Sequence, residues 1–211
     1  DPIDALKLDA SLSDDDIETL VQRLKDEADR HWYIDPNDSL QYAEKIIAIG
    51  HYYENPSHIA LGMMSKGDAL RYLAQYDDAW DLLVRAGDLF LEINDEVGWG
   101  RTCIGRLAMC IQVDKIEQAK TDAEKALQIF LDRQDYDKYV RLLNNLLYVY
   151  LTLSDYYSTI HIYDDLNNDP TIFDRLPLAR LAALYNNVGF AYFQIGQLEA
   201  SRHFYTLALK I

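Results

Sequence analysis

The chain of 211 residues has few of the residues that interrupt regular structure, with five prolines and nine glycines. An all-β protein of this length needs many tight turns, so this scarcity favours helices. The chain also lacks positive charge, since 35 acidic residues outnumber 20 basic ones and the formal net charge is −15. A protein that covers nucleic-acid phosphates or an anionic membrane needs a positive face, so neither partner is expected.

Cysteines and long apolar runs are equally scarce. Cys103 and Cys110 are seven residues apart on one expected helix, too far for an easy disulfide, and we expect two reduced core thiols in a cytoplasmic protein. No run of about 18 apolar residues occurs, so no membrane span is expected. What the chain does have is core material, because 49% of its residues are hydrophobic and 12% are aromatic. A disordered acidic chain would lack that material.

A repeat with a period near 40 residues organises the sequence. Three columns of residues keep this register. A fifth, degenerate unit opens the array, where Asp35 is expected to cap a helix that Pro36 starts. The columns are the turn hydrophobes Tyr76, Ile116, Tyr156 and Leu198, the small residues Ala79, Ala119, Thr159 and Ser201, and the set Ala86, Ala126, Leu166 and Ala208.

Each unit holds two helical patterns joined by a short polar junction, which predicts antiparallel helix pairs. Helix starts are also marked by Ser13, Asn55 and Asp155. One hairpin cannot bury its own apolar face, so neighbouring hairpins must stack into a curved solenoid. We expect an N-terminal extension at 1–12 and a single domain at 13–211. Its units are approximately 13–54, 55–94, 95–134, 135–169 and 177–211, and a surface loop at 167–177 precedes the last one.

The units resemble the tetratricopeptide repeat (TPR) family, whose hairpin has a small residue and an aromatic in the first helix and a Tyr-x-x-Ala turn into the second. The last unit, from Tyr185 to Tyr192 and on through Gly196 and Tyr205, carries the pattern most fully. The resemblance covers about Asp14 to the end. It implies an all-α fold, a right-handed α-solenoid of about five helix-turn-helix TPR units with about ten helices.

The sequence departs from the family in its period, near 40 rather than about 34 residues. Longer helices follow, as in the large bacterial TPR proteins related to the maltose-operon activator. Leu107 and Leu147 replace the usual glycine, so the resemblance does not predict close packing at the two helix crossings there. The stretches 67–71, 97–105 and 126–130 look like the arrays that precede a caspase-like CHAT protease domain in bacterial proteins.

No constellation of catalytic or metal-binding residues is visible, so we expect no enzyme and no metal or cofactor. The segment Gly98-Trp99-Gly100 lacks the strand-then-helix context of a phosphate loop, and we expect it to be a helix-start spacer between units. The carboxylate pairs Asp77-Asp78 and Asp164-Asp165 are explained by helix dipoles and solvation. The histidines are scattered without ligand spacing, at His31, His51, His58, His161 and His203.

The candidate site is the concave groove, where TPR proteins bind peptides or helices. Asparagine amides can anchor a bound backbone, arginine forks can hold carboxylates, and aromatic rings supply rigid apolar area. The alternative is that the asparagines only bridge neighbouring helices and the aromatics are core. The family's clamp for chaperone tails is not expected, because Met64 with Asp68 and Asn144 with Tyr148 occupy its places. The expected groove residues are Arg71, Tyr72, Arg101, Arg141, Asn144, Tyr148, Asn186 and Phe190.

We therefore predict a non-catalytic interaction module that binds a protein or peptide segment. The alternative is a regulatory or dimerisation segment of a larger bacterial effector, such as a CHAT-type protease or a transcription regulator. This alternative rests on Lys210 and Ile211, which end the chain inside an amphipathic helix without a polar closing helix. On that reading the protein continues past Ile211, or a second copy covers this end.

Overall fold

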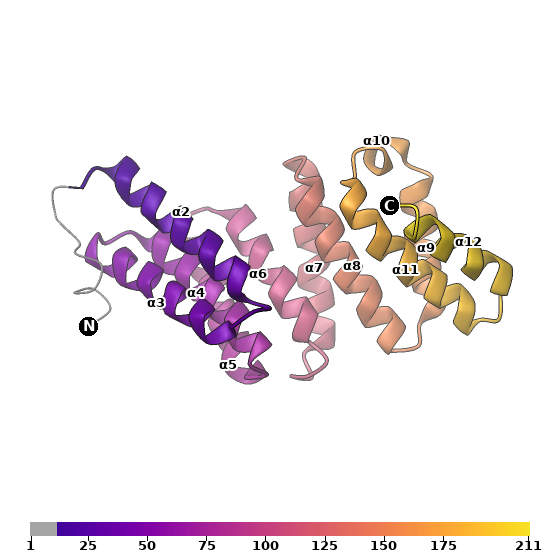
Figure 1. Ribbon diagram of the computed structural model, residues 1–211, viewed down its shortest axis with the longest axis horizontal. Helices are drawn as coiled ribbons and strands as arrows, with labels where there is room; N and C mark the ends of the chain where they lie inside the picture. The colour runs from indigo at the N-terminus through magenta and orange to yellow at the C-terminus, as the bar shows by residue number, and fades with distance from the viewer. Residues whose placement is uncertain (1–11) are drawn as a thin grey trace. The chain divides into compact units, whose positions relative to one another are not determined.

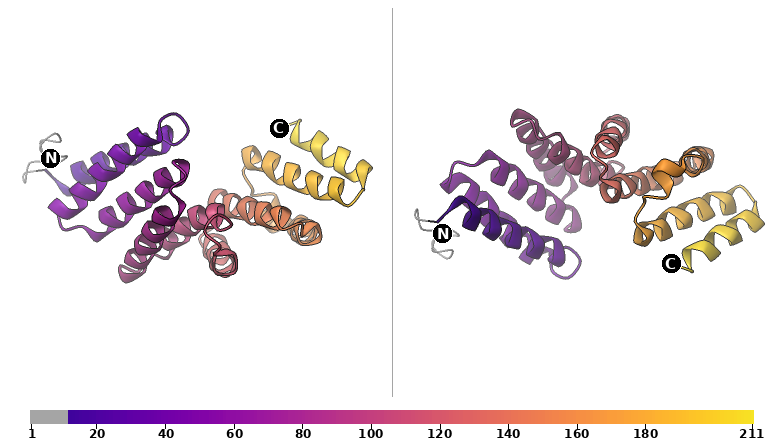
Figure 2. Two further views of the ribbon diagram at one scale, coloured as in Figure 1. Left: turned by 90° about the horizontal axis from the view of Figure 1, so that it is seen from below. Right: turned by 90° about the horizontal axis from the view of Figure 1, so that it is seen from above.

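The computed structural model describes residues 12–211, and all structural statements concern that part of the chain. The expected extension at 1–12 lies outside it except for Leu12. The described residues form an all-α structure with eleven helices, arranged as sequential antiparallel pairs (Figure 1). Figure 2 shows one such pair, α11 and α12, side by side in both views. The prediction of helical hairpins is confirmed.

Two compact units divide the chain, with the boundary between Lys115 and Ile116. This boundary falls between the two helices of the third expected repeat. That the five repeats form one solenoid stays a prediction. The first unit contains α2 (Asp14–His31), α3 (Pro36–Tyr52), α4 (Pro56–Tyr72), α5 (Tyr76–Glu92) and α6 (Glu96–Met109). The second contains α7 (Ile116–Asp132), α8 (Tyr136–Thr152), α9 (Tyr156–Asn167), α10 (Pro170–Phe173), α11 (Leu178–Gln194) and α12 (Leu198–Ala208).

The helix starts show that the 40-residue period is two equal halves. The first residues of α3 through α9 are 36, 56, 76, 96, 116, 136 and 156, each 20 after the last. The final pair keeps this interval, since α11 begins at 178 and α12 at 198. A helix and the turn after it therefore occupy 20 residues, whether the helix is the first or the second of its hairpin. The aligned columns of the sequence did not reveal this equality.

One turn geometry accounts for this regularity. After α4, Ala74 adopts a left-handed conformation with φ of 58°. Its N–H donates to the carbonyl of Arg71 (3.1 Å), and the N–H of Gln75 donates to the carbonyl of Leu70 (3.0 Å). This pair of bonds is the Schellman motif, which satisfies the last carbonyls of a helix. The same left-handed residue recurs at Glu54, Asn94, Asp114, Gln134, Ser154 and Gly196.

Helix starts follow the predicted caps. Ser13 and Asp16 form a reciprocal capping box at the start of α2. The side chains of Asp35, Asn55 and Asp155 accept hydrogen bonds from the first-turn amides of α3, α4 and α9. Satisfying these amides locally explains why these four helices begin where they do.

Two local predictions need refinement. Gly98-Trp99-Gly100 lies at a helix start, as expected, but it belongs to the first turns of α6 rather than to a spacer between units. A Cβ on Gly98 would lie 2.4 Å from the Phe90 ring on α5, so glycine is needed there because the two helices approach closely. The expected loop at 167–177 contains the short helix α10, which Asp169 caps, and Leu176 beyond it is buried.

In the first unit α4 is central, because it packs against α2, α3, α5 and α6. In the second unit α8 packs against α7, α9 and α11. Cys103 and Cys110 are buried and unbridged, as predicted. None of the helices in residues 12–211 is long and apolar enough to cross a bilayer.

Candidate functional site

A buried lysine lies on the first unit's α2. Lys25 is only 4% exposed and pairs with Asp29 one turn on. Its ammonium nitrogen is 5.3 Å from the centre of the Trp32 ring, within cation–π range. Burial lowers the pKa of Lys25, while the nearby carboxylates of Asp29 and Asp68 oppose that shift. A buried ammonium requires such partners, because its desolvation is costly.

The neighbouring helices α4 and α6 complete the charged part of the site. Asp68 on α4 and Arg101 on α6 both act electrostatically on Lys25. A Cβ on Gly105 would lie 2.8 Å from the Asp68 carboxylate, so this glycine lets the acid lie directly against α6. Arg71 approaches Asp68 only loosely, with 3.9 Å between Nε and Oδ1. The Arg71 guanidinium is therefore weakly held by its acid.

Aromatic rings flank these charges. The Tyr72 ring is stacked on Trp32 at 6.1 Å and meets the edge of Tyr33 at 5.0 Å. The guanidinium carbon of Arg71 is 4.3 Å from the centre of the Tyr72 ring. Burial raises the pKa of the Tyr72 hydroxyl. Tyr33 and the next residue, Ile34, are 78% and 73% exposed, so the rings continue outward to an accessible apolar patch. We call the whole set, Lys25, Asp29, Trp32, Tyr33, Asp68, Arg71, Tyr72 and Arg101, the Lys25 cluster.

Three of the predicted groove residues, Arg71, Tyr72 and Arg101, belong to the Lys25 cluster. The sequence reasoning missed its α2 members, because the first repeat looked degenerate. A signal was present: a shift of 40 residues from Tyr72 reaches Trp32, an aromatic in the same column. Lys25 gave no such signal. The residue 40 positions later is Ser65, which differs from lysine in both charge and size.

In the second unit, the amide of Asn144 is used inside the fold. The Nδ2 of Asn144 donates to the carbonyl of Arg180 on α11 (3.4 Å), and the Nδ2 of Asn187 donates to the Oδ1 of Asn144 (3.2 Å). Arg180 in turn donates from Nε to Asp137 on α8 (2.9 Å). These bonds tie α8 to α11, which is the bridging role left open above as the alternative.

The other predicted residues of this unit remain on the surface. Tyr148 on α8 is 57% exposed and Phe190 on α11 is 39% exposed. Asn186 is exposed and Arg141 is half-buried. The structure therefore brings Asn144 to Asn187 rather than to Asn186, and leaves two aromatic side chains accessible.

Comparison with protein-family models and with curated proteins found no match to this chain.

Proposed function

We propose that this chain is a TPR-type interaction module and that the Lys25 cluster binds a polypeptide segment. The support for the repeat is the regular succession of antiparallel helices that start every 20 residues. The observation that carries the binding site is the exposed Tyr33 ring, packed on Tyr72 beside the loosely paired Arg71. Tyrosine, tryptophan and arginine are the residues that most often dominate binding energy at protein interfaces.

Each part of the cluster has a task in this proposal. Tyr33 and Tyr72 supply rigid apolar area for a side chain of the bound segment. Arg71 turns its guanidinium from Asp68 toward a carbonyl or carboxylate of the segment, where a forked contact is available. Lys25 stays buried and holds Asp29 and Asp68 in place. The site therefore favours a segment that combines an apolar residue with an acidic group.

The test starts with selection of short random peptides on the full chain, followed by affinity measurements on single variants. Tyr33→Ser and Arg71→Gln should each weaken the selected peptide by about tenfold, equivalent to about 1.4 kcal/mol. Tyr157→Ser is the matched control, because Tyr157 is 65% exposed but lies in the second unit. Binding that neither cluster variant changes would remove the Lys25 cluster from the account.

A separate experiment tests whether the predicted groove residues of the second unit contribute to peptide binding. Asn144→Ala with Asn186→Ala should weaken the same peptide only if the bound segment reaches α8 and α11. Because Asn144 also bridges these helices, thermal unfolding must accompany the affinity measurement.

A further inference from the structure

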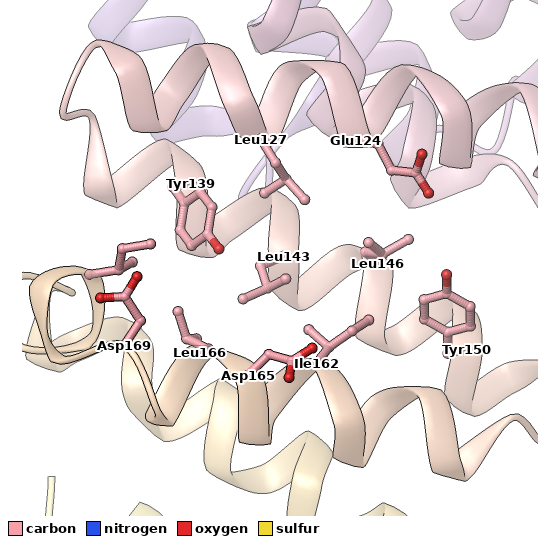
Figure 3. Close-up of a pocket in the computed structure, with 11 residues that line it drawn as sticks. Glu124, Leu127, Tyr139, Leu143, Leu146, Tyr150, Ile162, Asp165, Leu166 and Asp169 are labelled. Carbon is pink, nitrogen blue, oxygen red and sulfur yellow. The ribbon is translucent and has the colours of Figure 1, made fainter.

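A cleft of about 430 Å³ opens in the second unit, whereas the Lys25 cluster belongs to the first. Helices α7, α8 and α9 and the start of α10 surround it, and Figure 3 shows their side chains turned toward the opening (Figure 3). Its volume lies in the range of ligand-binding clefts, about 300–1,000 Å³. Its walls are mainly apolar, formed by Leu127, Leu143, Leu146, Ile162, Leu166 and Ile172.

The cleft has a sequence origin. In the first unit, a Cβ on Gly67 would lie 2.8 Å from Leu83, so α4 and α5 pack closely. Gly189 allows a similar approach of α11 to α12. The corresponding residue of α8 is Leu147, which is fully buried, and α8 packs less extensively against α9 than these pairs do. A leucine side chain takes up more room at a crossing than a glycine does, and apolar side chains of α8 and α9 line the cleft.

The cleft lies on the face of α8 opposite to Asn144 and Tyr148. At 100° per residue, Tyr139, Leu143, Leu146 and Tyr150 share one side of the helix. The residues that bond to α11 or stand exposed as groove candidates fall about half a turn away. A ligand in this cleft would therefore not compete with one on the groove face.

Three carboxylates mark the rim: Glu124, Asp165 and Asp169. In the view of Figure 3, Asp169 lies beside Tyr139 at one end and Glu124 above Tyr150 at the other. The N–H of Thr171 donates to Asp169 Oδ1 (3.0 Å) and holds that carboxylate in place. Burial raises the pKa of the Tyr139 hydroxyl, and the negative charge of Asp169 raises it further.

This acidity is specific to the cleft rather than a property of its unit. Residues 116–211 contain 12 acidic and 9 basic side chains, a net charge of −3, yet the described residues that line the cleft include no lysine or arginine. Lys120 lies beside one lining residue, since its ammonium is 5.0 Å from the centre of the Tyr150 ring. Within the described residues, the lining thus combines three carboxylates with an apolar floor and contains no lysine or arginine. Such a surface is complementary to a ligand that is both apolar and cationic.

We infer that the cleft between α7, α8 and α9 binds a short apolar segment of another polypeptide that carries a lysine or arginine. The lining of α8 runs from Tyr139 to Tyr150, about 16 Å of helix at 1.5 Å per residue. That length accommodates about five extended residues or three helical turns. The apolar side chains of the segment fill the floor, and its cation pairs with Asp165 or Asp169.

Two synthetic peptides test the inference on the full chain. Each has about ten residues, long enough to span the cleft, with leucines separated by lysines in one and by glutamates in the other. We expect the lysine peptide to bind at least about tenfold more tightly, measured by calorimetry. A third peptide, with serine in place of leucine, keeps the lysines and should not bind. Binding of the serine peptide with equal affinity would overturn the inference.

Charge-matched variants localise the binding. Asp164 and Asp165 are adjacent and both exposed on α9, but only Asp165 lines the cleft. Asp165→Lys should weaken the lysine peptide by about tenfold, whereas Asp164→Lys should change it by less than about twofold. Equal effects of the two variants would show a general attraction to a chain of charge −15 and would contradict the cleft.

Other occupants of the cleft give distinct results. A dimer in sedimentation that Asp165→Lys dissociates would assign the cleft to a second copy and overturn the proposal. Octylamine that binds as tightly as the lysine peptide would assign it to small cations and would equally contradict it. Tyr33→Ser should leave the lysine peptide unaffected, so failure here and failure of the Lys25 cluster are separate outcomes.

Discussion

At the scale of single residues, two polar side chains in apolar surroundings each pair with a specific neighbour. Lys25 has Asp29, and the hydroxyl of the buried Tyr163 donates to Asn167 over 3.4 Å. The Tyr163 ring also meets the edge of Phe204 at 5.0 Å. Burial of a polar group costs free energy unless the group is hydrogen-bonded or paired, and burial favours the uncharged form of an ionisable group.

Tyr163 predicts how stability responds to alkaline pH. Burial, with smaller contributions from Tyr185, Asp164 and Tyr192, raises the pKa of Tyr163 to about 12 from 10.0. Because the folded state holds this proton more tightly than the unfolded state, the stabilisation is complete below pH 10 and is lost as pH rises from 10 to 12. As the pH rises from about 9 to 11, the free energy of unfolding should therefore fall less in the Tyr163→Phe variant than in the wild type. Urea titrations at each pH measure this difference.

The control for this prediction is Tyr157→Phe, since Tyr157 is 65% exposed. It should follow the wild-type pH dependence. Burial also raises the pKa values of Tyr185 and Tyr192, so Tyr163→Phe should reduce the alkaline loss without abolishing it. A loss identical to that of the wild type would show that Tyr163 does not contribute.

At the scale of helices, a turn of uniform geometry connects one helix to the next. Seven turns share the left-handed residue, and six of these residues are not glycine. A left-handed conformation costs a residue with a Cβ about 1–2 kcal/mol, and less for asparagine or aspartate, whose side chains bond locally. Only the turn at Gly196 avoids this cost.

Ala74→Gly should therefore stabilise the protein. Relief of the left-handed conformation gives about 1–2 kcal/mol, and the greater freedom of glycine in the unfolded chain removes about 0.5–1 kcal/mol of it. We expect a net gain of about 0.5–1 kcal/mol in urea unfolding. Asn94→Gly, in the equivalent turn after α5, should give much less, and an equal gain in both would contradict the explanation.

Many of the helix boundaries were predictable from residues close together in the sequence. Ser13, Asp35, Asn55 and Asp155 were expected as caps, and the structure confirms them. The left-handed turns were not predicted, because Ala, Gln and Glu carry no preference for that conformation. There the Schellman bonds between turn and helix, rather than the residue type, decide the backbone.

At the scale of the whole molecule, charge and tryptophan are unevenly distributed. Residues 1–115 contain 23 acidic and 11 basic side chains, against 12 and 9 in residues 116–211. All three tryptophans, Trp32, Trp80 and Trp99, also precede residue 116. Tryptophan fluorescence therefore reports on the first unit, whereas helical circular dichroism reports on both.

This difference gives a test of the two units. Because the chain divides into two compact units after Lys115, and helical repeats interact mainly with their neighbours, we expect the two units to unfold separately. The urea midpoint from tryptophan fluorescence should then differ from that of circular dichroism at 222 nm. Coincident curves would show that the units unfold as one cooperative structure.

The sequence alone determined the helical class, the 40-residue period, the hairpins and the caps, because each depends on hydrogen bonds and apolar spacing within about one helix length. Only the tertiary structure decided what individual side chains do. It turned Asn144 to Asn187, buried Lys25 among α2, α4 and α6, and opened a cleft between α7, α8 and α9. These outcomes depend on the distances between helices that start about 20 or about 40 residues apart in sequence, and side-chain volume at the crossings sets those distances.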